Sequence, residues 1–407
     1  MIIPPDKFNK LKSIANKPLA NDPPNSTDTR SRAIRYQQKR IWTFDNDTLK
    51  VDNLFAAARL NGLSQNSENT FTALIMPENE PINRSPWFAF RIWSAKERII
   101  DLKMNYRHIT PHRYHPKISV DGVHWKSIDF EDFSFDLKTG RAGFRLHLPA
   151  GELWVAAQEI IDSKQVYAWI NSLDKFSYIK KIKFGLSHHK RPLIALNIGT
   201  ENTKKFVVVL NRQHPPEITG HLAMESLVET IAGGTDLARK FRQKFTTIVV
   251  PMLNPDGVDL GHWRHNALGA DLNRDWQFFR QPETLAFKKF FSKSIKQNQA
   301  NLYFALDFHS TREDVFYVFR PEFIAQNAPH LTQKWIKSIG AAIPNYKIRQ
   351  EAFGSDSPIS RNWFFREFGA DAVTYEVGDD TDRKTVKMKG RVAAEEMMKL
   401  LLKQEKS

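Results

Sequence analysis

The sequence predicts an α/β domain that is preceded by an antiparallel β-sandwich domain. Three segments with different patterns along the 407 residues lead to this prediction. Residues 1–40 are rich in Pro, Asn, Lys and Arg, residues 41–155 hold short and closely spaced strand-like runs, and residues 156–407 alternate fully apolar runs with helical segments. We therefore expect a basic irregular lead-in, a β-sandwich domain and an α/β domain over these three ranges.

The β-sandwich prediction depends on apolar runs of strand length with little helical pattern between them. Asp121-Gly122 is a typical hairpin turn, and it follows the strand-like run 117–120. Closely spaced strands joined in this way favour a sandwich of two sheets. Four further strands are expected at 70–76, 87–93, 99–106 and 143–148.

The α/β prediction depends on apolar runs that contain few polar residues. Such runs are typical of strands that helices cover on both faces, and helical patterns lie between several of them. A helix is also expected over 160–173. The expected strands are 193–198, 206–210, 247–253, 302–308, 315–319 and 372–377, and the expected helices are 217–231, 281–297, 331–342 and 385–403.

The composition limits the kinds of metal site and the location of the protein. The chain has no cysteine, so a zinc site would need histidine and carboxylate ligands. The lack of cysteine is compatible with a reducing cytoplasm, where we expect this protein. A membrane span is not expected, because no apolar run is long enough, and the short apolar start Met1–Ile3 does not indicate a secretory signal.

The net charge of +15 favours anionic partners such as acidic peptides, nucleic acid or anionic surfaces. A solvated basic surface accounts for the charge equally well. The basic residues are spread along the chain, and no long block of them marks a nucleic-acid arm. We therefore do not expect nucleic-acid or membrane binding, and the oligomeric state is left open.

Two histidines and a glutamate follow apolar strands of the second domain. His214 and Glu217 lie three residues apart after the run 206–210, and His309 follows the run 302–308. Open α/β sheets place their sites at the carboxyl ends of strands, and His nitrogen and Glu oxygen both suit zinc. Taken singly, each feature is more often structural. Together, three ligands leave a fourth position open for substrate, as in a catalytic zinc site.

A polar segment and a buried carboxylate complete the set of candidate residues. The long loop after the run 247–253 concentrates Arg264, Asn273 and Arg274, and the planar guanidinium group of arginine can form two hydrogen bonds with a carboxylate. A solvated salt-bridge loop is the alternative interpretation. Glu376 lies inside an apolar run, where a carboxylate is costly unless it is paired or functional. Beside zinc it could accept a proton from water.

These motifs resemble those of the zinc metallocarboxypeptidases. The matching elements, in order, are HPPE at 214–217, NPDG at 254–257, Trp263-Arg264, DLNRDW at 271–276, His309 and Glu376. The segments SPWFAFRIW at 85–93 and RYHPKISVDGVHW at 113–125 are similar to the amino-terminal domain of the cytosolic carboxypeptidase branch. The resemblance implies a carboxypeptidase-like mixed β-sheet flanked by helices, and a peptide hydrolase with one zinc ion in its catalytic domain.

The resemblance also implies a role for each matching residue. His214, Glu217 and His309 match the zinc ligands. Asp271 matches a carboxylate that orients the first zinc histidine. Glu376 matches the general acid/base of the reaction.

The remaining roles concern the substrate. Arg264 matches the arginine that polarises the scissile carbonyl, and Asn273 and Arg274 match the pair that binds the terminal carboxylate. Arg361 corresponds to the residue at the base of the pocket for the C-terminal side chain, where an arginine would favour Asp or Glu. A surface position for Arg361 is the alternative interpretation.

Three functions are compatible with these residues. The leading hypothesis is hydrolysis of the C-terminal bond of peptide or protein tails, with acidic tails as the expected partners. The alternatives are a zinc-dependent deacylase of small N-acyl amino acids and a non-enzymatic module that binds polyanions. The full DLNRDW segment and the first domain favour a peptide substrate. The tyrosine that caps the substrate in many relatives is not assigned, because 351–356 has none and Tyr346 lies several residues too early.

Overall fold

The computed structural model describes residues 34–80, 82, 85–107, 109–136, 138–200 and 203–404. These residues form two compact units. The sandwich unit consists of 34–163 and 256–270, and the α/β unit consists of 164–255 and 271–404. Most of the predicted lead-in over 1–40 lies outside the described residues. The domain boundaries near 40 and 155 stay a prediction.

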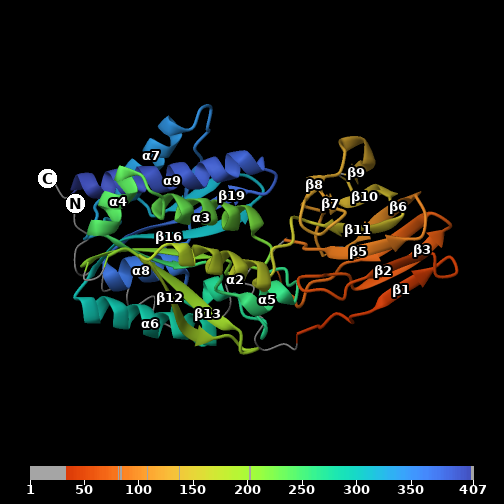
Figure 1. Cartoon of the computed structure of the whole chain (residues 1–407), viewed down its shortest axis with the longest axis horizontal. Helices are drawn as coiled ribbons and strands as arrows, with labels where there is room; N and C mark the ends of the chain where they lie inside the picture. The colour runs from red at the N-terminus through yellow and green to blue at the C-terminus, as the bar shows by residue number, and fades with distance from the viewer. Residues whose placement is uncertain are drawn as a thin grey trace. The chain divides into compact units, whose positions relative to one another are not determined.

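Two sheets form the sandwich unit (Figure 1), with the strand orders β1-β2-β5-β11-β7-β8 and β3-β4-β6-β10-β9. Buried and exposed residues alternate along β6 and β10, so one face of their sheet enters the core. The rings of Phe88 and Phe144 meet in that core, with centroids 5.8 Å apart. The strands are β1 Ile41–Phe44, β2 Leu49–Asp52, β3 Gly62–Ser67, β4 Thr70–Leu74, β5 Ala89–Ser94, β6 Arg98–Asn105, β7 Lys117–Ser119, β8 Lys126–Ser127, β9 Phe133–Asp136, β10 Arg141–Leu148 and β11 Gly151–Ala156, with a short 3₁₀ turn at Phe130–Asp132.

The predicted β-sandwich is therefore confirmed, with one departure from a purely antiparallel arrangement. Strands β4 and β6 pair in parallel. The reason is that β5, which lies between them in the sequence, belongs to the other sheet. The chain reverses direction twice before it returns to the first sheet, and it then runs in its original direction.

An eight-stranded mixed sheet forms the centre of the α/β unit, with the order β12-β13-β15-β14-β16-β19-β17-β18. The neighbours β15, β14, β16 and β19 are parallel, and the pairs β12–β13, β13–β15 and β17–β19 are antiparallel. The predicted mixed sheet is thus confirmed. The strands are β12 Ile179–Leu186, β13 Pro192–Ile198, β14 Lys205–Asn211, β15 Thr246–Val250, β16 Asn301–Thr311, β17 Val315–Val318, β18 Gln350–Ala352 and β19 Asp371–Gly378.

Helices cover both faces of this sheet (Figure 1). Helices α3, α4, α7 and α9 lie on one face, and α6 and α8 lie on the other. The helices are α2 Ser163–Ser172, α3 Ile218–Ile231, α4 Asp236–Lys244, α5 Pro255–Asp259, α6 Pro282–Asn298, α7 Leu331–Ala342, α8 Ser360–Phe368 and α9 Arg383–Gln404, with 3₁₀ turns at Leu173–Lys175 and Leu272–Arg274. No helix in the described part of the chain is both long enough and apolar enough to cross a membrane.

Each helix and strand predicted for the α/β unit is present, with shifts of a few residues at the ends. The strand predicted over 247–253 ends at Val250, because Pro251 cannot donate a backbone hydrogen bond to the next strand. Helices α4 and α8 were not predicted. Both have nine residues, too few for an apolar periodicity to stand out.

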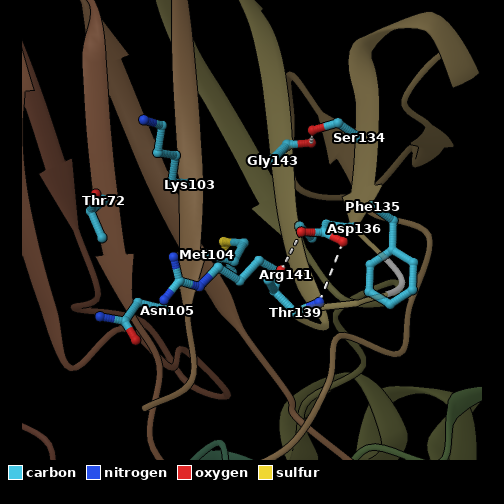
Figure 2. A pocket seen from close by; sticks show the side chains of 11 residues that line it. Thr72, Lys103, Met104, Asn105, Ser134, Phe135, Asp136, Thr139, Arg141 and Gly143 are labelled. Carbon is cyan, nitrogen blue, oxygen red and sulfur yellow. Dashed lines mark hydrogen bonds between the residues drawn. The ribbon is translucent and has the colours of Figure 1, made fainter. Parts of the chain in front are cut away.

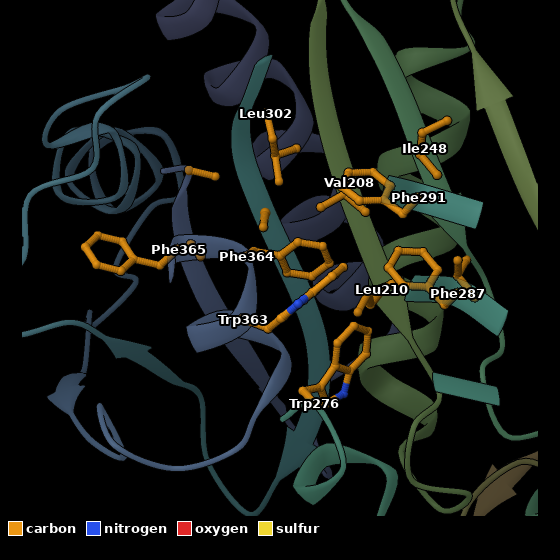
Figure 3. Packing of buried hydrophobic residues seen from close by; sticks show 14 of the residues in the cluster. Val208, Leu210, Ile248, Trp276, Phe287, Phe291, Leu302, Trp363, Phe364 and Phe365 are labelled. Atoms are coloured by element: carbon orange, nitrogen blue, oxygen red, sulfur yellow. The ribbon is translucent and has the colours of Figure 1, made fainter. Parts of the chain in front are cut away.

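An aromatic core lies between the sheet and the two helices α6 and α8 (Figure 3). Trp276 contacts Trp363 from α8 and Phe287 from α6, with ring centroids 5.4 and 5.6 Å apart. The indole N–H of Trp276 donates a hydrogen bond of 2.8 Å to Gln213 Oε1. The core thereby fixes a residue that directly precedes His214.

Candidate metal centre

Three parallel strands bring the predicted ligands and the predicted base to one edge of the sheet. His214 follows β14, His309 lies in β16 and Glu376 lies in β19. Since β14, β16 and β19 are parallel neighbours, their carboxyl ends meet at the same edge. The prediction that His309 follows its strand is wrong: β16 continues to Thr311, because these last residues still pair with β19.

A strained turn sets the position of His214. Arg212 directly follows β14 and has a φ of 51°, in the left-handed region that non-glycine residues rarely adopt. The turn is held by Asn254, whose backbone N–H donates to Arg212 O at 3.1 Å and whose side-chain amide donates to Gln213 O at 3.0 Å. The chain therefore reaches His214 along a fixed path.

The beginning of α3 is bound to the strand that carries His309. The backbone N–H of Gly220 donates to Ser310 Oγ at 2.8 Å, and Thr219 Oγ1 donates to Val377 O at 2.9 Å. A β-carbon at position 220 would collide with the carbonyl oxygen of His309, so only glycine allows this approach. Glu217 precedes α3 directly, and it is thereby placed against His309.

The two histidines and Glu217 form a compact buried group. His214 Nδ1 lies 2.8 Å from Glu217 Oε1, His309 Nδ1 lies 2.7 Å from Glu217 Oε2, and the two Nδ1 atoms are 3.1 Å apart. Two ligand atoms that each lie about 2.0–2.1 Å from a tetrahedral zinc ion are roughly 3.3 Å apart. In the described part of the chain, this group is the one with three His or carboxylate ligand atoms close enough to hold a metal ion.

The far nitrogen of each histidine faces a second carboxylate. His214 Nε2 lies 3.0 Å from Asp271 Oδ1, and His309 Nε2 lies 3.0 Å from Asp307 Oδ2. A neutral imidazole that donates its Nε2–H to a carboxylate presents the Nδ1 lone pair on its other side. Two lone pairs and the Glu217 carboxylate then converge on one point, and this donor set fits a zinc ion.

The carboxylate and the histidines of the group shift one another's pKa values. Burial by itself raises the pKa of Glu217, but the neighbouring His214 and His309 outweigh burial and hold this pKa below its ordinary value. Burial lowers the pKa of His309, and the carboxylates of Asp307 and Glu217 outweigh it, so this pKa lies well above its ordinary value. The group therefore has a strong preference for positive charge at its centre.

Asp307 is the residue at this centre that the sequence analysis missed. Its Oδ2 accepts hydrogen bonds from Gln213 Nε2 at 2.6 Å and from Ser360 Oγ, in addition to its contact with His309. The sequence does carry a signal for it. Asp307 lies two residues before His309 on one strand, so both side chains point to the same face of the sheet.

Glu376 lies beside His309 on the neighbouring strand. The two residues are direct partners in the parallel register of β16 and β19. Partners of this kind have side chains on the same face, with strands about 4.8 Å apart. The carboxylate also contributes to raising the pKa of Tyr317 on β17 to about 12, although burial is the larger cause. Glu376 is therefore next to the metal centre rather than part of its ligand set.

Asn273 and Arg274 lie in the 3₁₀ turn at Leu272–Arg274, two and three residues after Asp271. Asn273 Oδ1 accepts a hydrogen bond of 3.0 Å from the backbone N–H of Ser360, and its Nδ2 lies 3.3 Å from His309 Nε2. Arg274 Nη1 donates to Asn273 O at 2.8 Å. The structure thus brings Asn273 to the metal centre, and Arg274 follows it directly in the chain.

Arg361 is buried in α8, with 1% of its surface exposed, so the surface alternative is wrong. Its Nη2 donates to Phe353 O, and its guanidinium carbon lies 4.7 Å from the centre of the Phe319 ring. Among the described residues, Nε and Nη1 have no hydrogen-bond partner. Burial lowers the pKa of Arg361 to about 10, with Asp307 acting in the opposite direction, so the group stays charged at neutral pH.

Tyr346 and Arg264 are the two remaining residues that the sequence singled out. Tyr346, considered for the substrate cap, has its hydroxyl 3.1 Å from that of Tyr375. Arg264 belongs to the sandwich unit, whereas Asn273 and Arg274 belong to the α/β unit. The loop that the sequence analysis treated as one segment is therefore divided between the two units.

A separate hollow of about 520 Å³ lies on the outer face of the sheet that contains β6 and β10 (Figure 2). Lys103, Asn105, Arg141 and Gly143 line it. Oppositely charged pairs such as Arg145–Asp101 occupy the adjoining part of this face. None of the predicted site residues lines the hollow.

Comparison with known proteins identifies the family. The family described as zinc carboxypeptidase matches residues 166–384, which is more than half of the chain. Similar curated proteins are cytosolic carboxypeptidase 6 of Caenorhabditis elegans, 28% identical over 156 residues and 36% of this chain, and cytosolic carboxypeptidase 6 of Mus musculus, 28% identical over 153 residues and 35% of this chain. The matches span 34% and 28% of the length of those relatives.

Solved structures show the same fold over most of the chain. The crystal structure of a metallo-carboxypeptidase from Burkholderia cenocepacia superimposes with a TM-score of 0.72 at 21% identity, and the match covers 88% of this chain and 99% of that one. At this identity the likeness concerns the fold alone. The family match leads to one conclusion: the chain belongs to the zinc carboxypeptidase family.

Proposed function

We propose that this protein is a zinc-dependent carboxypeptidase that hydrolyses the C-terminal peptide bond of its substrate and prefers Glu or Asp at that end. The observation that carries the proposal is the buried His214–Glu217–His309 group. Each of its histidines has a carboxylate at the far nitrogen, as metal ligands usually do. The family match supports the same chemistry.

His214, Glu217 and His309 would hold the zinc ion. When bound, zinc acts as a Lewis acid on a carbonyl oxygen and lowers the pKa of water. Asp271 and Asp307 keep both rings in the tautomer whose Nδ1 lone pair faces the metal position. Three protein ligands leave one position open for substrate or water.

Glu376 is the proposed general base. It lies beside His309 in the register of the sheet and is not needed as a ligand. Its carboxylate accepts a proton from the attacking water and then donates it to the departing amine. Its partial burial on a strand keeps the carboxylate in one place during both transfers.

Three further residues are proposed to bind the substrate, each on the strength of the motif it occupies. Arg264 polarises the scissile carbonyl and stabilises the oxyanion. Asn273 and Arg274 bind the terminal carboxylate. The guanidinium group of Arg274 donates to Asn273 O, and the planar shape of such a group suits a carboxylate.

Arg361 is the proposed source of acidic specificity. A buried guanidinium group with two nitrogens that lack a hydrogen-bond partner among the described residues favours an anionic acceptor. A Glu or Asp side chain of the substrate would supply two such acceptor oxygens. The names of the similar cytosolic carboxypeptidases support a cytoplasmic location for this activity.

The activity is tested with purified protein, metal analysis and synthetic peptides. We expect about one zinc ion per chain and release of the C-terminal residue. Glu376→Gln should keep the zinc and lower kcat by roughly 10³-fold or more, since proton transfer and its electrostatic support are both removed. Full turnover by this variant would refute the base assignment. Faster hydrolysis of N-acyl amino acids than of peptides would instead support a deacylase.

The specificity is tested with peptides that differ only in the last residue. We expect Glu to be released faster than Leu or Lys. Arg361→Gln should lower kcat/KM for the Glu peptide by roughly 10- to 100-fold, the value of hydrogen bonds to a charged group. Arg366→Gln is the matched control, because Arg366 lies on the same helix and its Nη2 donates to Ser355 O at 2.5 Å. Faster release of Leu or Lys than of Glu by the unmodified protein would contradict the proposed preference for acidic residues.

A further inference from the structure

Residues 256–270 lie between two parts of the α/β unit in the sequence, yet they fold with the sandwich unit. The backbone N–H of Ala57 donates to Asp259 O at 2.8 Å, and the indole N–H of Trp263 donates to Trp87 O at 3.0 Å. Gly261 has a φ of 62°, and a β-carbon there would lie 2.5 Å from Ala58 O. This close packing fixes the segment that contains Arg264.

A buried carboxylate of the sandwich unit holds the backbone on both sides of Arg264. Glu78 is fully buried and accepts hydrogen bonds from three successive backbone N–H groups. The distances are 2.7 Å from Trp263, 3.0 Å from Arg264 and 2.9 Å from His265. His265 Nδ1 adds a fourth contact at 2.9 Å. Both oxygens of the carboxylate are thereby used on one short stretch of chain.

A buried arginine holds the residues just before that stretch. Arg59 is 1% exposed, its Nε donates to Gly261 O at 2.7 Å and its Nη2 donates to Leu260 O at 3.2 Å. Glu78 thus binds backbone donors and Arg59 binds backbone acceptors of the same segment. The opposite charges of Arg59 and Glu78 also stabilise each other inside the unit.

The hold of Glu78 on the segment 263–265 depends on the negative charge of its carboxylate. Burial by itself raises the pKa of Glu78, but His262, His265 and Arg59 outweigh burial and hold this pKa below its ordinary value. The carboxylate is therefore ionised at neutral pH. Hydrogen bonds from backbone N–H groups to an ionised carboxylate are roughly twice as strong as neutral ones, and a buried charge that loses such partners is costly.

We propose that Glu78 is a positioning residue for Arg264: it fixes the backbone from Trp263 to His265, and so the direction in which the Arg264 side chain leaves the chain. The inference rests on the role proposed for Arg264 in the hydrolysis. An error of about 1 Å in such a position is enough to cost roughly 100-fold in rate.

The first test is independent of activity. Hydrogen exchange of the backbone N–H groups of 263–265 is compared between the unmodified protein and Glu78→Gln. We expect these amides to be protected in the unmodified protein and to exchange at least tenfold faster in the variant, because a neutral amide holds them more weakly. Unchanged protection in the variant would overturn the proposal.

The second test is a double-mutant cycle on kcat with a C-terminal Glu peptide. Glu78→Gln should lower kcat by roughly 10- to 100-fold with little change in KM, and Arg264→Ala should lower it by about 100-fold or more, as the loss of one oxyanion donor does. If Glu78 acts through Arg264, the double variant is no slower than Arg264→Ala alone. Multiplication of the two effects would overturn the proposal.

Two further variants distinguish a specific effect of Glu78 from a general loss of stability. Asn53→Ala removes a fully buried side chain of the same unit that accepts from Arg40 N at 2.8 Å and donates to Gln38 O and Leu60 O at 2.9 Å. Its effect on kcat should be small and should multiply with that of Arg264→Ala. If Glu78→Gln does not fold, Glu78→Asp replaces it in both tests, with faster exchange and a lower kcat expected.

The outcomes separate this inference from the proposed function. An unmodified protein that hydrolyses no peptide, or an Arg264→Ala variant with full kcat, contradicts the proposed function and leaves the exchange result to decide whether Glu78 holds the segment. A strong effect of Arg264→Ala combined with no effect of Glu78→Gln or Glu78→Asp contradicts only the positioning role. Coupled effects on kcat together with faster exchange support both.

Discussion

The two units contain clusters of the same residue types with opposite properties. In the α/β unit, Glu217 lies between His214 and His309, and in the sandwich unit Glu78 lies beside His265, with His262 nearby. Both carboxylates are buried, at 8% and 0% exposure, and both have a pKa below the ordinary value. Only the first cluster fits a metal ion among the described residues.

The difference lies in what surrounds each carboxylate. Three of the four contacts to Glu78 come from backbone N–H groups, which carry their hydrogen permanently and offer no lone pair to a metal. Around Glu217, each histidine has one further carboxylate at its far nitrogen, which turns the lone pair of the other nitrogen inward. Residue type and burial alone therefore do not distinguish a metal site from a carboxylate that holds the backbone. The distinction is whether the neighbouring groups present hydrogen-bond donors or lone pairs to the carboxylate.

The largest expected effect is on zinc binding, when each of the two buried glutamates is replaced in turn. Glu217→Gln should abolish zinc binding and lower the activity by roughly 10³-fold or more, because a charged ligand becomes a neutral amide. Glu78→Gln should keep about one zinc ion per chain. Metal content after dialysis, measured on both purified variants, decides the matter. Equal zinc content in the two variants would contradict the assignment of the metal site.

A second prediction concerns the pH dependence of the cluster around Glu78. Burial is the main cause that lowers the pKa of His262 to about 4, from 6.5 in an exposed histidine. The unfolded chain therefore takes up a proton near pH 6.5, whereas the folded protein does so only near pH 4. The contribution of His262 to stability is fully present above pH 6.5, and roughly 3 kcal/mol of it is lost as the pH drops toward 4.

This prediction is checked by urea unfolding at several pH values between 8 and about 4, with the slope compared among variants. His262→Gln should show a smaller loss of the free energy of unfolding on acidification. His147→Gln is the control, because His147 is an exposed residue of β10. An equal pH dependence in the unmodified protein and in His262→Gln would show that another group causes it.

The smallest expected effect concerns Asp271, the carboxylate at the far nitrogen of His214, and its influence on zinc affinity. Asp271→Asn should weaken zinc binding by roughly 10- to 100-fold, since a neutral amide no longer fixes the tautomer of His214. Asp275→Asn is the matched control: Asp275 is also buried, and it accepts from Gln281 N at 2.9 Å and from Arg280 N at 3.1 Å. Competition with a zinc chelator measures both affinities, and equal affinities would contradict the role of Asp271.

Much of the fold could be predicted because it depends on local patterns. Apolar runs and helical spacing gave the central strands and the long helices, since burial on two faces excludes polar residues from a strand. The short helices α4 and α8 and the parallel pair β4–β6 could not be predicted. A nine-residue helix shows little periodicity, and the direction of β6 depends on β5 joining the other sheet.

The sequence by itself indicated which residues belong to the candidate site, because His214, Glu217, His309 and Glu376 follow or lie near the ends of apolar runs. The tertiary structure decided which hydrogen-bond partners surround these residues. Asp307 and Glu78 belong to no sequence motif. Asp307 binds Gln213, which is 94 residues away in the sequence, and Glu78 binds His265, which is 187 residues away. Such contacts arise only when separate strands and loops pack together, and a pattern along the chain cannot encode them.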